Sequence, residues 1–151
     1  MNLELRAIDD TNRDAVASLE VTDHQKQYIA SNNRSLETAA KEEYREIARP
    51  FALYADGKVI GFTMFAFELT SSDPSDRYWL WRFMIDRRWQ GKGYGSAALE
   101  KIIDYFRSHG ADHILLSTKE TNTAALSLYR KYHFAETGEM NEDEIVLRLN
   151  L

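Results

Sequence analysis

The chain has 151 residues and contains no cysteine, which excludes disulfides, thiolate metal sites and a cysteine nucleophile. Its apolar runs are far shorter than a membrane span requires. It opens on an alternating segment, Met1–Arg6, where a secretory leader would place a charged and then an apolar stretch. These absences predict a protein with no membrane partner, and they make the cytoplasm its expected location.

A long basic run is also missing, and the formal net charge is −5. Nucleic-acid binders concentrate positive charge on one face, so no nucleic-acid partner is expected. A net acidic surface slightly favours cationic small molecules. There are only four histidines, and His109 and His113 are separated by Gly110 at an expected helix end. No metal site is therefore predicted.

The most informative stretch is Trp89–Ser96, which holds three of the seven glycines. An apolar run, Trp79–Ile85, precedes it, and apolar residues at helical spacing follow it from Leu99 to Phe106. A glycine loop that leads into a helix is an anion site, because its N–H groups converge and the helix N-terminus adds partial positive charge. Three cations stand beside it: Arg87, Arg88 and Lys92. We therefore expect a phosphate or pyrophosphate ligand.

Neither common nucleotide motif matches this loop. The Walker motif ends in Lys-Ser or Lys-Thr, and the dinucleotide motif reads Gly-x-Gly-x-x-Gly, whereas these glycines recur at every second residue. The pattern that fits is Gln90-x-x-Gly93-x-Gly95, which resembles the pyrophosphate loop of the GNAT superfamily, the acetyl-CoA-dependent N-acetyltransferases. The alternative is a glycine-rich turn without a ligand.

The order of expected elements is consistent with that resemblance. Strands are expected at 2–8, 51–55, 59–67, 78–86, 114–117, 133–139 and 144–151, and helices at about 13–19, 35–48, 94–110 and 122–132. Pro50 marks the end of the second helix. This order predicts an α+β protein, a mixed sheet of about seven strands flanked by about four helices. The resemblance implies that a single domain, 1–151, has the GNAT fold.

A second stretch, Glu120–Phe134, also resembles the family. Asn122 stands at a helix start, a face of small residues follows, and Tyr129 lies near the end of the helix. Family members usually carry glycine where this chain has His133. That departure falls in a turn, so it affects the direction of the chain more than the chemistry.

The resemblance implies a site for acetyl-CoA as co-substrate. The backbone of the central strand would bind pantetheine like an added strand, at Phe83, Met84 and Ile85. The pyrophosphate would be held by Arg87, Arg88, Gln90, Gly91, Lys92, Gly93, Tyr94, Gly95 and Ser96. Asn122 would hydrogen-bond the pantetheine arm, and Ala124 and Ala125 would leave room for it. The alanines are also good helix formers, which is their alternative role.

The chemistry implied is direct acetyl transfer from the thioester to a primary amine in a ternary complex. The hydroxyl of Tyr129 would lie near the thioester sulfur and protonate the leaving thiolate. A backbone N–H of the central strand would stabilise the oxyanion. Judged from spacing alone, Tyr129 and Leu128 could instead be core residues on one helix face.

The general base is left open by the sequence. In polyamine-acetylating relatives an acidic residue often stands two positions before the equivalent of Phe83, and here that position is Trp81. Glu68, on the neighbouring strand, is the candidate base, acting through water, and Glu120 is a poorer one. A solvated charge at a strand end is the alternative for Glu68. The reaction could also proceed without a side-chain base, from the small neutral fraction of the amine.

The N-terminal half suggests a polyamine acceptor. Gln25-x-x-Tyr28-Ile29 and the strand Trp79–Asp86 are similar to bacterial spermine/spermidine acetyltransferases. Aromatic and acidic side chains would bind the cation, at Tyr28, Trp79, Trp81, Glu20, Asp23, Glu37 and Glu68. Their alternatives are core positions for the aromatics and solvated helix faces for the acids. Another acceptor (an amino acid, an aminoglycoside or a protein N-terminus), a non-catalytic acyl-CoA-binding module, a domain serving mainly in oligomerisation, and a homodimer stay open.

Overall fold

The structure is a computed structural model that describes residues 2–151. Its strands are β1 (Leu3–Ala7), β2 (Ala48–Ala55), β3 (Lys58–Phe67), β4 (Tyr78–Ile85), β5 (His113–Thr118), β6 (Ala135–Asn141) and β7 (Glu144–Asn150). Its α-helices are α1 (Arg13–Ser18), α2 (Asn32–Ala40), α3 (Tyr94–Ser108) and α4 (Thr123–Lys131). Short 3-10 turns lie at His24–Gln27, Glu42–Tyr44, Pro74–Asp76 and Arg87–Trp89. This order confirms the predicted α+β class.

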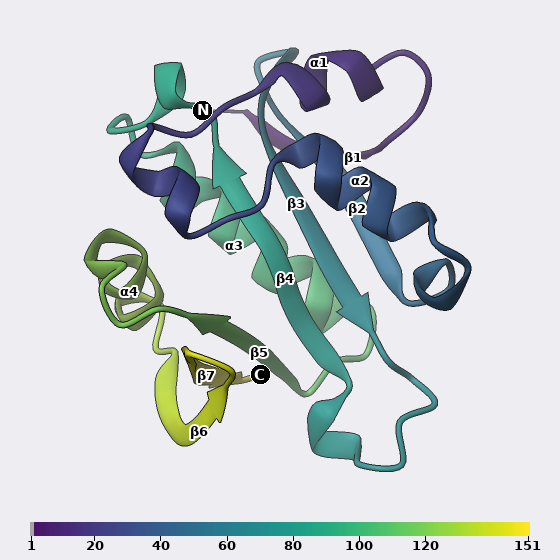
Figure 1. Cartoon of the computed structure of the whole chain (residues 1–151), viewed down its shortest axis with the longest axis vertical. Coiled ribbons are helices and arrows are strands. Elements are labelled where there is room, and N and C mark those ends of the chain that lie inside the picture. The colour runs from purple at the N-terminus through teal and green to yellow at the C-terminus, as the bar shows by residue number, and fades with distance from the viewer. Residues whose placement is uncertain (1) are drawn as a thin grey trace.

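One sheet runs through the molecule in the order β1-β2-β3-β4-β5-β7-β6. Strands β1 to β4 are antiparallel neighbours, and so are β5, β7 and β6. Strands β4 and β5 are parallel, and over the part of the chain described their register consists of one pair, Trp79 with Leu115. The two halves of the sheet therefore diverge beyond that pair, as Figure 1 shows.

Helices cover both faces of the sheet. Helices α1 and α2 lie on one face and α3 on the other (Figure 1). The core on the α3 side includes Phe65, Leu99, Ile102, Phe106 and Leu116. The core on the α1–α2 side includes Val16, Leu36, Phe62, Met64 and Met84. Burying each large apolar side chain contributes about 1.5–3 kcal/mol, so the sheet is held firmly from both sides. Within residues 2–151 no helix has both the length and the apolar character of a membrane span.

The second helix differs at both ends from the predicted range 35–48. Helix α2 begins at Asn32 because Ser31 caps it, accepting a hydrogen bond on its Oγ from the N–H of Arg34 at 3.2 Å. It ends at Ala40. Several residues of the block can serve as a cap, and the sequence does not show which one is used.

Pro50 lies inside strand β2, so its interpretation as the end of a helix is wrong. The pairing of β1 with β2 extends only as far as Phe51. Pro50 thus lies where one edge of β2 has no neighbour, and a residue without an N–H removes no ladder hydrogen bond there.

A β-bulge interrupts the pairing of β4 with β3, where the register passes from Leu80 to Arg82 and leaves Trp81 as the extra residue. A bulge places two successive side chains on the same face of a sheet. Both side chains accordingly lie on the α2 side: Arg82 donates from Nε to Ser35 Oγ at 3.3 Å, and the Trp81 ring meets the Tyr44 ring edge-on at 5.2 Å.

Helix α4 ends on a left-handed residue that is not glycine. His133 has a φ of +73°, its N–H donates to the carbonyl of Arg130 at 3.0 Å, and the N–H of Phe134 donates to the carbonyl of Tyr129 at 3.1 Å. This is the Schellman arrangement, and the rings of Phe134 and Tyr129 lie 5.6 Å apart. The predicted strand start at 133 is therefore wrong, because the cap delays the strand to Ala135.

We expect His133→Gly to stabilise the fold by about 0.5–1 kcal/mol. A Cβ in the left-handed region costs about 1–2 kcal/mol, and the larger unfolded-state entropy of glycine offsets about half of that gain. Urea unfolding followed by tryptophan fluorescence measures the difference. The control is His109→Gly, since His109 ends α3 at a φ of −101° and glycine relieves no strain there. A His133→Gly protein less stable than the parent would contradict this account of the turn.

Candidate active site

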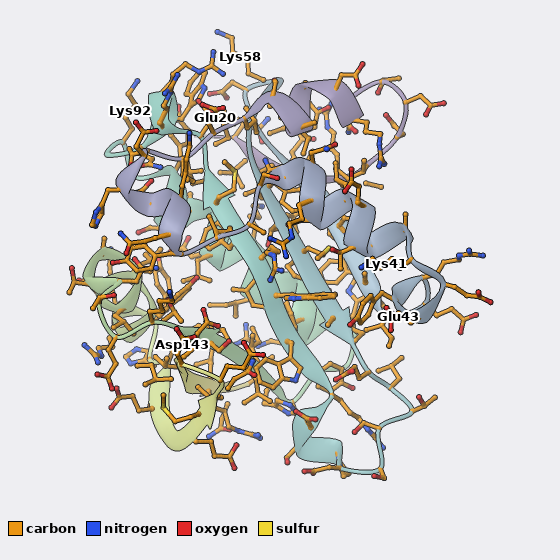
Figure 2. All side chains as sticks on the ribbon, in the orientation of Figure 1. Glu20, Lys41, Glu43, Lys58, Lys92 and Asp143 are labelled. Atoms are coloured by element: carbon orange, nitrogen blue, oxygen red, sulfur yellow. The ribbon has the colours of Figure 1, made fainter. Side chains whose placement is uncertain are left out.

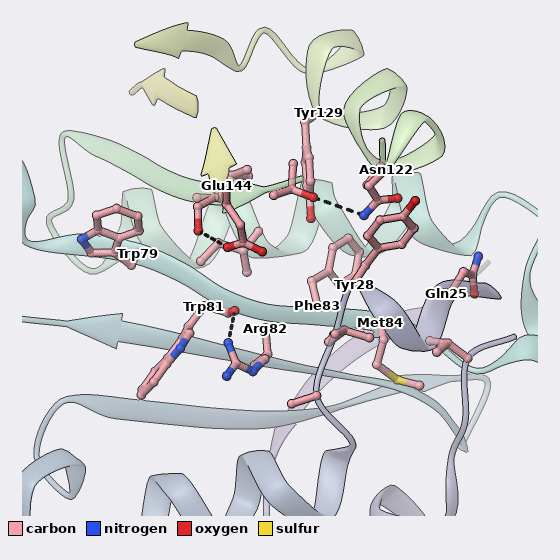
Figure 3. Close-up of a pocket in the computed structure, with 18 of the residues that line it drawn as sticks. Gln25, Tyr28, Trp79, Trp81, Arg82, Phe83, Met84, Asn122, Tyr129 and Glu144 are labelled. Carbon is pink, nitrogen blue, oxygen red and sulfur yellow. Dashed lines mark hydrogen bonds between the residues drawn. The ribbon is translucent and has the colours of Figure 1, made fainter. Parts of the chain in front are cut away.

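A cavity of about 920 Å³ occupies the gap between β4 and β5. Its walls come from residues 25–30, from β4, from the end of β5, from α4 and from the turn between β6 and β7. Figure 3 shows Trp79 at one end of this cavity and Gln25 at the other, with Asn122 and Tyr129 on the α4 side. The cavity exists because the two strands diverge beyond their single pair, which exposes the edge of β4 that faces β5.

The glycine loop has the backbone of an anion site. Gly91 and Gly93 have φ values of +73° and +86°, in the region that favours glycine. Gly93 is the N-cap of α3 and, having no side chain, makes no side-chain hydrogen bond to the first turn of that helix. The N–H groups of this turn are thus available to a phosphate. Figure 2 shows Lys92 at the edge of the molecule beside the loop.

The side chain of Gln90 anchors the loop to two other segments. Its Nε2 donates to the carbonyl of Ile85, at the end of β4, at 2.9 Å and to Gln25 Oε1 at 2.8 Å. The Nε2 of Gln25 donates back to Gln90 Oε1 at 3.1 Å. This reciprocal amide pair links the glycine loop to residues 25–30, which form another wall of the cavity.

Asp86 fixes the entry to the loop. It is 2% exposed, accepts from the N–H of Glu20 at 2.9 Å, and accepts from the N–H and Nε of Arg88 at 3.1 and 2.8 Å. Burial alone would raise the pKa of Asp86, but the Arg88 guanidinium and these N–H groups together hold it below its usual value. Arg87 reaches Glu20 at 3.8 Å. Both arginines near the loop therefore already contact carboxylates.

The α4 side supplies the two predicted residues of the second motif. Asn122 donates from Nδ2 to Thr118 Oγ1 at 3.2 Å, which leaves its amide oxygen to accept from a ligand. Tyr129 lines the cavity, and within residues 2–151 no side chain or backbone group hydrogen-bonds its hydroxyl. Burial raises the pKa of Tyr129. Ala124 and Ala125 also line the cavity.

The predicted coenzyme A residues divide into two groups. Those that line the cavity are Phe83, Met84, Ile85, Gln90, Gly91, Gly95, Asn122, Ala125 and Tyr129. Those outside its walls are Arg87, Arg88, Lys92, Gly93, Tyr94 and Ser96. The first group surrounds a path for an extended arm along β4, and the second forms the loop and helix start where that path ends.

The predicted acceptor residues are only partly brought together. Glu68, Trp79 and Trp81 line one end of the cavity. Tyr28 lies toward the other end, where its hydroxyl donates to the carbonyl of Thr121 at 3.1 Å, so the three aromatic rings do not form one slot. Burial raises the pKa of Glu68, and the nearby carboxylate of Asp76 adds to the rise.

The other three predicted acids lie outside the cavity. Glu20 and Asp23 both pair with Lys26, at 3.8 and 3.1 Å. Glu37 accepts a hydrogen bond from Asn33 at 3.2 Å along α2. These contacts fit the alternative of solvated charges on a surface.

Several charged residues that line the cavity were missed from the sequence, among them Glu144 and Arg82. Glu144, at the start of β7, accepts from Ser117 Oγ at 2.8 Å. Arg82 has a guanidinium that donates to Ser35 and to the carbonyl of Trp81 at 3.0 Å. Nothing local marks Glu144, because only the pairing of β7 with β5 brings it to the cavity.

Known proteins match the chain over most of its length. A family model described as "Acetyltransferase (GNAT) family" matches residues 13–134. A spermine/spermidine N(1)-acetyltransferase of Bacillus subtilis (strain 168) is 35% identical over 144 residues, which are 93% of each chain. A ribosomal protein bS18-alanine N-acetyltransferase of Escherichia coli (strain K12) is 29% identical over 108 residues, covering 66% of this chain and 69% of the relative.

Solved structures agree on the fold. A spermidine N-acetyltransferase from Vibrio cholerae, in complex with CoA and spermine, superposes with a TM-score of 0.72 at 21% identity, over 99% of this chain and 94% of that one. The predicted fold is thereby confirmed. Given the family match and the near full-length relative, the chain belongs to the acetyltransferase (GNAT) family and is an N-acetyltransferase.

Proposed function

We propose that this enzyme transfers the acetyl group of acetyl-CoA to a primary amine of a polyamine such as spermidine or spermine. The observation that carries the proposal is one continuous cavity, which is lined by the glycine loop, by Tyr129 and by the carboxylates of Glu68 and Glu144. One end suits a polyanion and the other a polycation, so the two substrates meet near the tyrosine.

The glycine loop and α3 would hold the pyrophosphate of acetyl-CoA through their free N–H groups. The pantetheine arm would run along the exposed edge of β4, where Phe83 and Ile85 offer backbone donors and acceptors as a neighbouring strand would. The amide oxygen of Asn122 would accept from the arm on its other side. This path leads the thioester toward Tyr129.

Tyr129 would then act as the general acid. The amine nitrogen forms a bond to the acetyl carbon, the carbon–sulfur bond breaks, and the Tyr129 hydroxyl gives its proton to the leaving sulfur. Because burial raises its pKa, this phenol keeps its proton at neutral pH. Within residues 2–151 its hydroxyl makes no hydrogen bond, so it is free to face the sulfur.

The acceptor end supports a polyamine. Within residues 2–151 no cationic side chain forms an ion pair with Glu68, whose pKa is raised by burial and by Asp76. A distal ammonium group would neutralise this carboxylate. The indole ring of Trp79 offers a face on which a cation can lie, whereas the Trp81 ring already has the Arg82 guanidinium 5.4 Å from its centroid. The 35% identity to a spermine/spermidine acetyltransferase favours the same acceptor class.

One observation favours a second acceptor class. The guanidinium of Arg82 lines the cavity and donates only to neutral groups, Ser35 and the Trp81 carbonyl. A partly buried guanidinium is a good partner for a carboxylate. An amine that carries its own carboxylate, such as an amino acid, is therefore the second candidate.

Thiol release from acetyl-CoA, followed with a thiol reagent, tests the proposal. The panel contains spermidine, spermine, a diamino acid, an aminoglycoside and a peptide with a free N-terminus. The protein contributes no thiol background because it lacks cysteine. We expect the highest kcat/KM with the polyamines. A preference for the diamino acid would overturn the polyamine assignment and point to Arg82 as the carboxylate partner.

A further inference from the structure

The proposed transfer has no carboxylate at the middle of β4, because position 81 is Trp81, whose ring packs on Tyr44. Glu68 does not fill that place. Its N–H donates to the carbonyl of Arg77 at 2.8 Å, which aligns Glu68 with the residue before β4 begins. Phe83 follows Arg77 by six positions, which corresponds to about 20 Å of strand. Glu68 is thus too far along the strand to take a proton directly from an amine near Phe83.

Glu144 lies on the wall of the cavity opposite β4, next to Ser117 of β5. The parallel pair Trp79–Leu115 aligns β4 with β5, so Ser117, two residues further along β5, lies on the same side of that pair as Trp81. The Oγ of Ser117 donates to Glu144 Oε1 at 2.8 Å. Figure 3 shows this carboxylate in the cavity, on the far side from β4.

Arg82 and Glu144 carry opposite charges but do not pair with one another. Burial lowers the pKa of Arg82, and the carboxylate of Glu144 opposes that shift, which places the two charges within each other's field. Among the side chains of residues 2–151 they nevertheless form no ion pair with one another. Glu144 therefore keeps one oxygen for an ammonium group, while Ser117 holds the other.

We propose that Glu144, oriented by Ser117, binds the reacting ammonium group of the acceptor and takes its proton. Glu144 on β7 would thus be the general base, the role that an acidic residue at position 81 of β4 would otherwise have. This inference rests on the proposed function, since it assigns a role at the same acceptor site.

Each proton in the proposed reaction has a named donor and acceptor. The Glu144 carboxylate takes one proton from the ammonium group and releases it to solvent. The freed lone pair forms the carbon–nitrogen bond, and the carbon–sulfur pair leaves on sulfur, which takes the proton of Tyr129. A second proton leaves the nitrogen as the amide forms and, through water, restores the Tyr129 hydroxyl. One proton is released in total for each ammonium ion acetylated.

Other charged groups line the same cavity as Glu144, including Arg34 from α2 and Glu142 and Asp143 from the β6–β7 turn. Arg82 faces it from β4 and Tyr129 from α4. Beside it in the turn, Asp143 pairs with Lys119 at 3.6 Å. The positive charge of Arg82 lowers the pKa of a nearby amine, which assists its deprotonation. Figure 2 shows Asp143 at the β6–β7 turn.

The test is Glu144→Gln, which keeps the shape and an acceptor for Ser117 but removes the charge. We expect kcat/KM for the best amine to fall by about 100-fold at neutral pH, a typical loss for a general base. The deficit should shrink by about tenfold per pH unit toward the pKa of the amine, because the neutral amine then needs no base. The dissociation constant of acetyl-CoA should not change.

The matched control is Glu139→Gln, which removes the same charge from exposed strand β6, outside the cavity. It should leave kcat/KM unchanged at every pH. A Glu144→Gln enzyme within about twofold of the parent, or one with the same deficit at every pH, would overturn the role of Glu144 as base.

Different results would contradict the role of Glu144 and the choice of a polyamine as acceptor. The amine used is the one that the parent enzyme acetylates fastest, whether or not it is a polyamine. If that amine is not a polyamine, the proposed acceptor is wrong, and the pH-dependent deficit of Glu144→Gln still supports the base. If the parent acetylates polyamines and the variant shows no deficit, the base is wrong and the function stands. A parent that acetylates no amine overturns both.

Discussion

Gly93→Asp is expected to weaken acetyl-CoA binding by more than about 100-fold. Gly93 is the N-cap of α3, whose first turn has no capping side chain. An aspartate at an N-cap accepts from the N–H groups of the first turn, so the new carboxylate would occupy the phosphate site and repel the phosphates. Isothermal titration calorimetry with acetyl-CoA measures the change.

Gly93→Asn is the control for Gly93→Asp, because it adds a side chain of the same shape without the negative charge. Asparagine and aspartate have nearly the same volume and the same tolerance of the left-handed region, which the φ of +86° at this position demands. We expect a loss of only about tenfold for asparagine, because it competes for the N–H groups without repelling phosphate. Unchanged affinity in Gly93→Asp would show that the glycine loop is not the phosphate site.

Tyr129→Phe is expected to lower kcat by about 100-fold or more, the usual contribution of a general acid. The phenol lines the cavity, and burial raises its pKa so that it stays protonated. The ring remains in the variant and keeps its packing on Phe134. The dissociation constant of acetyl-CoA should therefore stay within about twofold of the parent value. Steady-state thiol release and calorimetry measure the two quantities.

The C-cap residue of the same helix is a control tyrosine. Tyr132 donates to Glu100 at 2.9 Å and to the carbonyl of Ser96 at 3.3 Å, and it does not line the cavity. Tyr132→Phe should keep most of the kcat while losing a comparable hydroxyl from the C-cap of α4. If Tyr129→Phe turns over as fast as Tyr132→Phe, the acid is another group.

The features that sequence alone predicted are local. The glycine spacing around Gly93 and the apolar spacing from Leu99 to Phe106 each depend on residues close in the chain, and the structure has both as expected. The family match at residues 13–134 includes both stretches. Local patterns of this kind identify elements because helix and loop conformations are set by neighbouring residues.

The features that sequence missed depend on pairing between distant segments. Glu144 reaches the cavity through the register of β7 on β5, and Arg82 shares a face with Trp81 only because of the bulge against β3. Simple alternation along β4 would have placed Arg82 and Trp81 on opposite faces. The acids Glu20 and Asp23 were assigned to the acceptor by charge alone, and both instead pair with Lys26.

The most direct test of polyamine acetylation is a competition for limiting acetyl-CoA. The enzyme receives an equimolar mixture of spermidine, spermine, a diamino acid, an aminoglycoside and a peptide, and mass spectrometry identifies the acetylated products. We predict that N-acetylated spermidine and spermine account for nearly all of the acetyl groups transferred. Transfer mainly to the diamino acid or to the peptide would contradict the proposed polyamine acceptor.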